Sequence, residues 1–344
     1  MMDKKKQIGN GIFLIAVFAL TLYSVFHGQD LQALQEYIAA ADVRYWLAAV
    51  PCVLLFIGSE SVIIYYMMRT IGQKIMLGHC FLYSFVGFFF SCITPSASGG
   101  QPAQIYYMRK DEIPIPVSTL VLMIVTITYK LVLVVLGIAV MLFRPPFIMT
   151  CIQPVIGWCY LGVGLNVFCV TFMLILVFHP TLAERILLWC LKAGSKLHLI
   201  RREAHYKEKI IHTMEQYRGV ASYFSTHKMV VWNVFLISVV QRMLLFFVTY
   251  LVYCSFGLEG TGMINIVLLQ GMISVAVDML PLPGGMGISE KLFLEMFVPV
   301  FGTITLPAMI VSRGLGYYTE LLVSAVFTVV AHLMIGRTKG EKNK

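Results

Sequence analysis

Long apolar runs dominate the chain, and their lengths predict how often it crosses a membrane. A helix needs about 20 consecutive apolar residues to span the hydrocarbon core of a bilayer. Runs close to this length predict about six full transmembrane helices, at residues 12–26, 45–68, 117–143, 155–178, 229–256 and 314–335. Residues 30–41 carry apolar side chains at helical spacing over a shorter distance, which predicts a helix on the outer surface.

Two further apolar regions are interrupted by proline and glycine. The sequence TPSASGGQP breaks residues 79–113, and PLPGGMG breaks residues 263–301. Proline ends a helix, whereas paired glycines allow a tight turn and the close approach of another group. Packing glycines in kinked helices are the plainer explanation of a single Gly-Gly pair. Because the pattern occurs twice with flanking prolines, we predict two re-entrant hairpins, the arrangement that indicates a transporter's binding site between structural repeats.

The composition agrees with this pattern and gives the fold class. Hydrophobic residues make up 59% of the chain and charged residues 12%, whereas a soluble domain has about a quarter charged residues. We therefore predict an all-α polytopic membrane protein, a single integral membrane domain over residues 1–344 with an internal structural repeat. Its parts are a first half (1–178), a basic amphipathic cytoplasmic segment (179–228) and a second half (229–344).

The net charge of +9 is explained by orientation in the membrane. Lysine and arginine are concentrated at residues 4–6, 180–228 and 337–344, and basic loops stay on the cytoplasmic side. Both termini are thus predicted to be cytoplasmic, where each surface cation gains about 1 kcal/mol from anionic lipid headgroups. Nucleic-acid binding is not needed to explain the charge. One helical face within the basic segment predicts an amphipathic helix at the membrane interface, with Ile210, Met214, Tyr217, Ala221 and Phe224.

Charged residues also lie in or beside the apolar runs: Glu60, Lys130, Arg242, Asp278, Glu290, Lys291, Arg313 and Glu320. An unpaired charge at the centre of a transmembrane helix costs about 2.5–3.5 kcal/mol on insertion scales. A structural ion pair explains any one of these residues as well as a ligand contact does. Together they predict a polar interior that suits a zwitterionic or charged headgroup.

The sequence predicts neither a metal site nor a cofactor. His198, His205 and His212 recur at seven-residue steps near Glu208, but this spacing matches no known ligand motif. A solvated helical face explains the pattern equally well. The phosphate-binding pattern GxxxxGK[ST] is absent from the sequence, so nucleotide hydrolysis is not supported.

Two motifs carry a family resemblance that covers nearly the whole chain. SCITPSASGGQPAQIYYMRK and LPLPGGMGISE resemble the paired signatures of the transmembrane region of lysylphosphatidylglycerol synthases. That region is the lipid-flipping half of the bacterial multiple peptide resistance factor, which confers antibiotic resistance, and of its stand-alone relatives. Full-length members add a cytoplasmic aminoacyltransferase domain. Because this chain ends at Lys344, directly after the last predicted span, we expect no such domain here.

The resemblance implies a site in the two broken elements. The positions that it carries over are Thr94, Pro95, Gly99, Gly100, Gln101, Pro102, Pro283, Gly284, Gly285 and Gly287. The residue pattern adds Ser98, Glu290 and the intramembrane charges Glu60, Lys130, Arg242, Asp278, Arg313 and Glu320. No catalytic residue can be assigned from the sequence.

The leading hypothesis is a flippase-like translocase of the bacterial cell membrane, whose substrate is phosphatidylglycerol or its lysyl derivative. The alternative is a phosphatidylglycerol lysyltransferase that uses lysyl-tRNA, or another transferase acting on a membrane lipid. An accessory protein acting through its cytoplasmic loop is a third hypothesis, which leaves the polar interior unexplained. Expected partners are a membrane phospholipid and anionic headgroups, with lysyl-tRNA only under the alternative. The sequence leaves open whether two copies form a homodimer.

Overall fold

Long apolar helices form the body of the protein, which a computed structural model describes for residues 31–196 and 203–335. All regular secondary structure in these ranges is helical. Five helical segments are long and apolar enough to cross a membrane: α3 (Val43–Thr70), α6 (Ile115–Phe143), Pro146–Phe178, α11 (Lys228–Ser255) and Val298–Met334. The predicted all-α polytopic fold is thus confirmed. The first predicted span, residues 12–26, lies outside the described residues, and the internal repeat stays a prediction.

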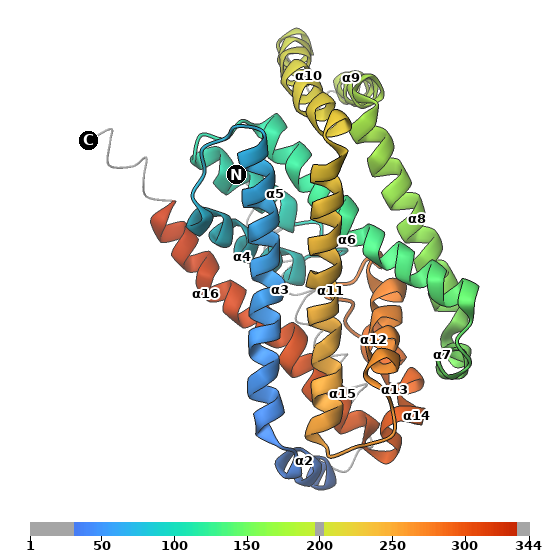
Figure 1. Cartoon of the computed structure of the whole chain (residues 1–344). Helices are drawn as coiled ribbons and strands as arrows, with labels where there is room; N and C mark the ends of the chain where they lie inside the picture. Colours follow the sequence, from blue (N-terminus) through green and yellow to red (C-terminus); the bar gives the residue numbers. More distant parts are fainter. Residues whose placement is uncertain (1–30, 197–202, 336–344) are drawn as a thin grey trace.

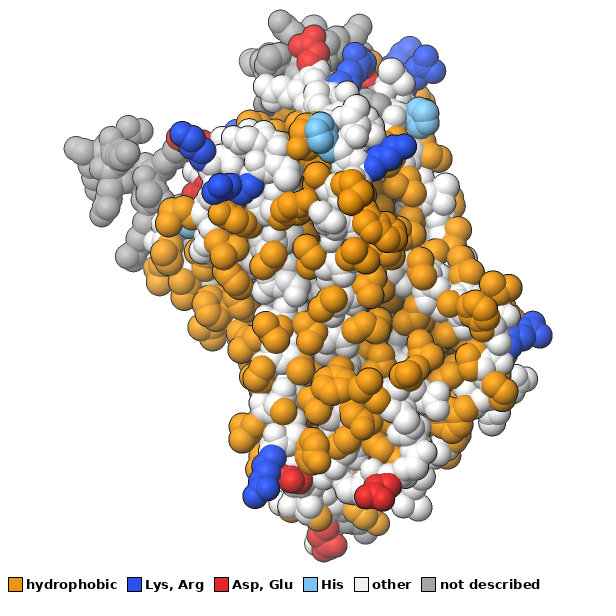
Figure 2. Space-filling model, viewed as in Figure 1, with side chains coloured by type: hydrophobic (Ala, Val, Ile, Leu, Met, Phe, Trp, Pro, Cys, Tyr) orange, Lys and Arg blue, Asp and Glu red, His pale blue; other side chains and the backbone are white. Residues whose placement is uncertain are grey.

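The antiparallel helices α3 and α11 pack side by side in the middle of the molecule (Figure 1). At one end the backbone N–H of Asp42 donates to the carbonyl of Ser255 at 2.8 Å, and the Trp46 indole donates to the Ser255 hydroxyl at 3.0 Å. At the other end Asn233 donates to the Tyr66 hydroxyl at 3.0 Å. Hydrophobic side chains cover the middle of the molecular surface, and charged ones gather mainly at the two ends (Figure 2). This is the surface expected of a chain surrounded by lipid.

Two short helical hairpins enter the body from opposite ends. Helices α4 (Leu77–Ile93) and α5 (Gly100–Lys110) follow α3, whereas α12 (Met263–Val277) and α13 (Ile288–Met296) follow α11. Because α3 and α11 are antiparallel, the two hairpins start at opposite ends of the pair, and their tips point toward each other (Figure 1). The sequence predicted the two broken elements, and the tertiary structure determines their opposed directions.

The last span begins earlier than residue 314. Helix α15 (Thr305–Arg313) runs through a π-helical turn, η3 (Gly314–Tyr318), directly into α16 (Thr319–Met334), after α14 (Val298–Phe301) and a 3₁₀ turn, η2 (Gly302–Ile304). The predicted start of this span at residue 314 was wrong, because Pro307 and Arg313 interrupt the apolar run in the sequence. Pro307 lies in the first turn of α15, where proline removes no helical hydrogen bond.

The segment Pro146–Phe178 consists of α7 (Pro146–Ile152), η1 (Gln153–Val155) and α8 (Ile156–Phe178). The remaining described helices are α2 (Leu31–Ala40), α9 (Pro180–Lys196) and α10 (Glu203–Thr226). The apolar face of α10 packs within the protein, because Met214 and Phe224 are buried and the Tyr217 hydroxyl donates to the carbonyl of Leu176 at 3.2 Å. Our interpretation of this face as a membrane-interface surface is therefore wrong. Its apolar side chains join a core cluster that includes residues of α6.

Candidate functional site

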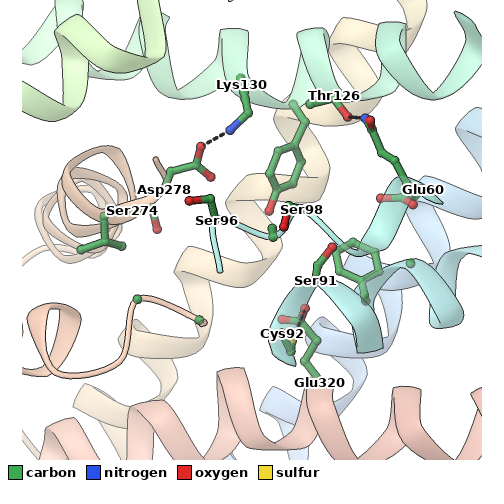
Figure 3. A pocket seen from close by; sticks show the side chains of 18 of the residues that line it. Glu60, Ser91, Cys92, Ser96, Ser98, Thr126, Lys130, Ser274, Asp278 and Glu320 are labelled. Atoms are coloured by element: carbon green, nitrogen blue, oxygen red, sulfur yellow. Dashed lines mark hydrogen bonds and ion pairs between the residues drawn. The ribbon is translucent and has the colours of Figure 1, made fainter. Parts of the chain in front are cut away.

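Charged side chains from the middles of the long helices converge on one cavity of about 410 Å³ (Figure 3). Lys130 lies halfway along α6, Arg242 halfway along α11, and Glu320 halfway along the continuous helical segment Thr305–Met334. All six predicted intramembrane charges line this cavity: Glu60, Lys130, Arg242, Asp278, Arg313 and Glu320. The structure thus brings together residues that are 260 positions apart in the sequence, Glu60 to Glu320.

Asp278 is the centre of the basic side of the cavity. It follows α12 directly and forms an ion pair with Lys130, and its other carboxylate oxygen accepts from Nη2 of Arg242 at 3.4 Å. The Arg242 guanidinium also lies over the ring of Tyr129, 3.2 Å from the centroid. Arg242 is 3% exposed, and its Nε has no hydrogen-bond partner among the described residues. A buried donor without a partner costs free energy, so an anionic oxygen that reached this Nε would be stabilised.

Two other carboxyl groups in the cavity have only neutral hydrogen-bond donors as contacts. The Gln104 amide donates to Glu60 at 2.7 Å, and the Cys92 thiol donates to Glu320 at 3.4 Å. Glu320 is 8% exposed. Within the described part of the chain, neither carboxyl group forms an ion pair. Asp278 contacts two cations at the same cavity, so the two sides of the cavity differ in how their charge is balanced.

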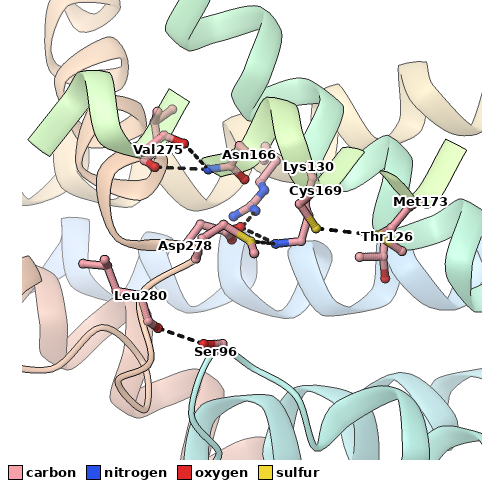
Figure 4. Close-up of polar contacts among 12 residues, drawn as sticks. Ser96, Thr126, Lys130, Asn166, Cys169, Met173, Val275, Asp278 and Leu280 are labelled. Atoms are coloured by element: carbon pink, nitrogen blue, oxygen red, sulfur yellow. Dashed lines mark hydrogen bonds and ion pairs between the residues drawn. The ribbon is translucent and has the colours of Figure 1, made fainter. Parts of the chain in front are cut away.

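The tips of the two hairpins meet beside the cavity. Pro95 and Pro283 form an antiparallel β-bridge between the tips. The Ser96 hydroxyl donates to the carbonyl of Leu280 at 3.1 Å (Figure 4). Behind the second hairpin, the Asn166 amide donates to the carbonyl of Val275 at 3.2 Å and thereby fixes α12 against α8. Few bonds join the tips, whereas each hairpin is held firmly to its own neighbours.

The first tip turns at residues that are not glycine. Ser96 and Ala97 have left-handed φ angles of 51° and 53°, whereas Gly99 has an ordinary φ of −83° and Gly100 is the first residue of α5. The Thr94 hydroxyl stabilises the turn, because it accepts from the Gly99 N–H at 2.8 Å and donates to the Phe90 carbonyl at 2.6 Å. The expectation that the Gly-Gly pair makes this turn is therefore wrong.

Gly100 allows α4 and α5 to pack closely instead. A Cβ atom at position 100 would lie 2.2 Å from the Ser91 hydroxyl and 2.7 Å from the backbone oxygen of Gly87. Pro102 is accommodated in the first turn of α5, where a proline is tolerated. The Gln101 amide donates to the Thr126 hydroxyl and so connects α5 to α6.

The second tip turns at glycines, as the sequence predicts. Gly284, Gly285 and Gly287 have φ angles of 55°, 65° and 84°. The Glu290 carboxylate accepts from the Gly287 N–H at 2.7 Å and from Nε of Arg313 at 2.8 Å. Arg313 also donates to the carbonyl of Gly284 at 3.1 Å. Arg313 therefore fixes the second tip to the last span.

The predicted site residues thus fall into two groups. Ser98, Gln101, Gly284 and Gly285 line the cavity together with the six charges. The others lie in the tips and their supports, outside the lining: Thr94, Pro95, Gly99, Gly100, Pro102, Pro283, Gly287 and Glu290.

Several functional candidates carried no clear signal in the sequence. The cavity is also lined by Tyr129, Tyr317, Gln104 and Thr126. Only Tyr129 and Thr126 could have been indicated by the sequence, as polar groups within the apolar run of α6. Lys291 does not line it, because its side chain is 71% exposed and lies 3.8 Å from Glu295. The described residues contain no cluster that could hold a metal ion. His198 and the side chains of His205, Glu208 and His212 lie outside the described part.

The fold and the cavity define a class of protein: a polytopic membrane protein with two opposed re-entrant hairpins around a charged interior. Residues 11–324 match the sequence profile of the family described as lysylphosphatidylglycerol synthase TM region. The match covers most of the chain, so the protein belongs to this family, which connects it with membrane lipids. A comparison with functionally curated proteins gives no match.

Proposed function

We propose that the protein is a phospholipid translocase of the bacterial cell membrane, acting on phosphatidylglycerol or its lysyl derivative. One observation carries the proposal: six charged residues from spans and hairpins converge on a cavity beside the meeting point of two opposed hairpin tips. Such a cavity provides a polar path for a headgroup at mid-membrane depth, while the acyl chains stay in lipid. The family membership supports a lipid as the substrate.

The basic side of the cavity suits a lipid phosphate. Lys130 and Arg242 both approach Asp278, and Nε of Arg242 is free to donate a further hydrogen bond. A phosphate oxygen would accept that bond and gain from the nearby ammonium group. The bridge between Pro95 and Pro283 and the bond from Ser96 to Leu280 join the tips. Their separation would open the cavity, and their closure would isolate it.

Surface charge supports an orientation for this movement. Cations at the α9–α10 end include Arg69, Lys74, Arg109, Lys110, Arg185, Lys192, Arg218 and Lys228, whereas Arg44 and Arg144 flank the opposite ends of their helices. By the positive-inside rule the α9–α10 end is cytoplasmic. The first hairpin would then enter from the cytoplasm and the second from outside. Cytoplasmic termini stay a prediction, because both termini lie outside the described residues. Anionic headgroups would contact the basic end, and a homodimer stays a prediction.

The second candidate function is a transferase, which the family description favours because it contains the word synthase. A lysyltransferase needs a donor site for lysyl-tRNA and a base beside the lipid hydroxyl. Glu60 or Glu320 could accept a proton, but a cavity of about 410 Å³ between membrane helices is far too small for a tRNA. The translocase is therefore the better-supported function.

Purified protein in liposomes separates the two functions. Fluorescent phosphatidylglycerol and its lysyl derivative would be followed from one leaflet to the other, and transfer from lysyl-tRNA would be measured in parallel. We expect translocation without transfer, and Lys130→Met or Arg242→Met should reduce it strongly in folded protein. Lys291→Met is the matched control, because that lysine is exposed outside the cavity. Transfer without translocation would overturn the proposal.

A further inference from the structure

Among the described residues, two carboxyl groups of the cavity have no cation in direct contact with them. The lining contains three acidic residues, Glu60, Asp278 and Glu320, and three basic residues, Lys130, Arg242 and Arg313. Lys130 and Arg242 are both bound to Asp278. Arg313 is bound to Glu290, which lies behind the lining. The numbers match, but every cation is already engaged, so Glu60 and Glu320 lack a direct positive partner.

The wider surroundings of the two carboxyl groups differ, because two arginines lie near Glu320 without contacting it, whereas none of the described cations acts on Glu60. Glu320 has electrostatic neighbours on several other elements: Glu60 of α3, Cys92 of α4, Tyr129 of α6, Arg242 of α11 and Arg313 of α15. Tyr317 of the π-helical turn η3 also faces it. Glu60 has Gln104, Tyr129 and Glu320 around it. No Lys, Arg or His in the described ranges reaches ion-pair distance of either group.

A carboxylate in this position is costly unless something positive or a proton neutralises it. Burial of an unpaired charge away from water costs several kcal/mol even after the protein relaxes, and carboxyl groups avoid this cost by taking up a proton. A metal cation fits poorly, because it needs several oxygen ligands. Here the contacting atoms are the donor N–H of Gln104 and the donor S–H of Cys92.

We propose that Glu60 and Glu320 are a proton-binding site and that proton movement through them drives the translocation step. The proposal rests on the translocase function and supplies its energy source. A proton enters from the side to which the cavity is open, binds a carboxylate oxygen, and leaves from the other side after the hairpin tips rearrange. Asp278 takes no part, because Lys130 and Arg242 already balance its charge. No bond other than that to the proton forms or breaks.

Proton binding can be tested without any lipid substrate. Infrared difference spectra between acidic and alkaline buffer report the C=O stretch of a protonated carboxyl group in the purified protein. We expect this band near neutral pH, with part of it lost in Glu60→Gln and part in Glu320→Gln. Glu295→Gln is the matched control, because Glu295 pairs with the exposed Lys291 outside the cavity and should leave the band unchanged. A band that neither cavity variant changes would overturn the proposal.

Coupling is tested in liposomes that contain fluorescent phosphatidylglycerol and a pH dye. Each pH unit is a tenfold ratio of protons, so a gradient of about two units can bias the lipid distribution up to about 100-fold when one proton accompanies each lipid. We expect a bias of this kind together with proton flux, and the loss of both in Glu320→Gln and Glu60→Gln. Each variant is a separate test of coupling, so if one of them fails to fold, the other still decides the outcome.

The outcomes separate this inference from the proposed function. Translocation that ignores the gradient in the wild type leaves the translocase standing and overturns proton coupling. Absence of translocation refutes the translocase and with it the coupling, while the infrared band still decides whether the two carboxyl groups bind protons. In a third outcome, the wild type translocates lipids that carry an amine preferentially, Glu60→Gln and Glu320→Gln lose this preference, and translocation does not respond to pH. That result assigns the carboxylates to the lipid headgroup and overturns the proposal.

Discussion

Replacing Asp278 by asparagine removes the only carboxylate that Lys130 and Arg242 contact within the described structure. The side chain of Arg242 is 4% exposed and that of Lys130 is 14% exposed, so neither cation regains full hydration. Removal of one partner from a buried ion pair costs about 3–5 kcal/mol. We expect the lower part of this range, because Lys130 can turn toward the cavity.

A second substitution tests whether charge imbalance is the cause. Lys130→Met alone leaves Asp278 with Arg242 and should cost less, about 1.5–3 kcal/mol, the value of a hydrogen bond to a charged group. The double variant with Asp278→Asn and Lys130→Met removes one charge of each sign. Once Asp278 is replaced, Lys130 is a part-buried cation without its carboxylate, so its replacement by methionine should restore stability and the double variant should be more stable than Asp278→Asn alone. This requires a coupling between the two residues larger than the cost of Lys130→Met, in the upper part of the usual range of about 0.5–3 kcal/mol.

Thermal unfolding of the detergent-purified protein provides the measurement. Cys80, Cys92, Cys151 and Cys159 are buried free thiols, so a thiol-reactive dye reports the loss of structure. Asp278→Asn should reduce translocation, because Lys130 and Arg242 lose the carboxylate that positions them. Lys130→Met and the double variant should lose translocation, because Lys130 is needed at the cavity. Our reasoning is refuted if Asp278→Asn is as stable as the wild type, or if the double variant is no more stable than that single variant.

Two further predictions concern the glycines and the orientation. Gly100→Val should lower the yield of monodisperse protein, because its Cβ would lie 2.7 Å from a backbone oxygen. Gly285→Val strains a φ of 65° and should abolish translocation, whereas Gly164→Val, with nothing within 4 Å, should leave both yield and translocation unchanged. Equal behaviour of the three variants by gel filtration and lipid assay would contradict this. A cysteine introduced at position 207 should react with an impermeant reagent only from the cytoplasm, and one at position 32 only from outside. Labelling of position 207 in intact cells would disprove the orientation.

Local features could be predicted from the sequence alone. Run length decides whether a segment can span, so α3, α6 and α11 could be predicted to within about two residues of their observed bounds. Proline and glycine revealed both hairpins, because helix termination depends on the residues at the break. The cost of an intramembrane charge also predicted a shared polar interior for six residues far apart in the chain.

The way in which these features combine depends on the packing of the helices in three dimensions. Ion pairing depends on the rotation and register of neighbouring helices. The sequence therefore could not indicate that Asp278 pairs with two cations or that Arg313 pairs with Glu290. The role of Gly100 could not be predicted either, because close packing of α4 on α5 and a left-handed turn both favour glycine. The apolar face of α10 fits a membrane surface or a protein core equally well, and only its packing against neighbouring helices, among them α6 and α8, distinguished the two. Interactions between distant segments are set by packing geometry, which no single segment contains.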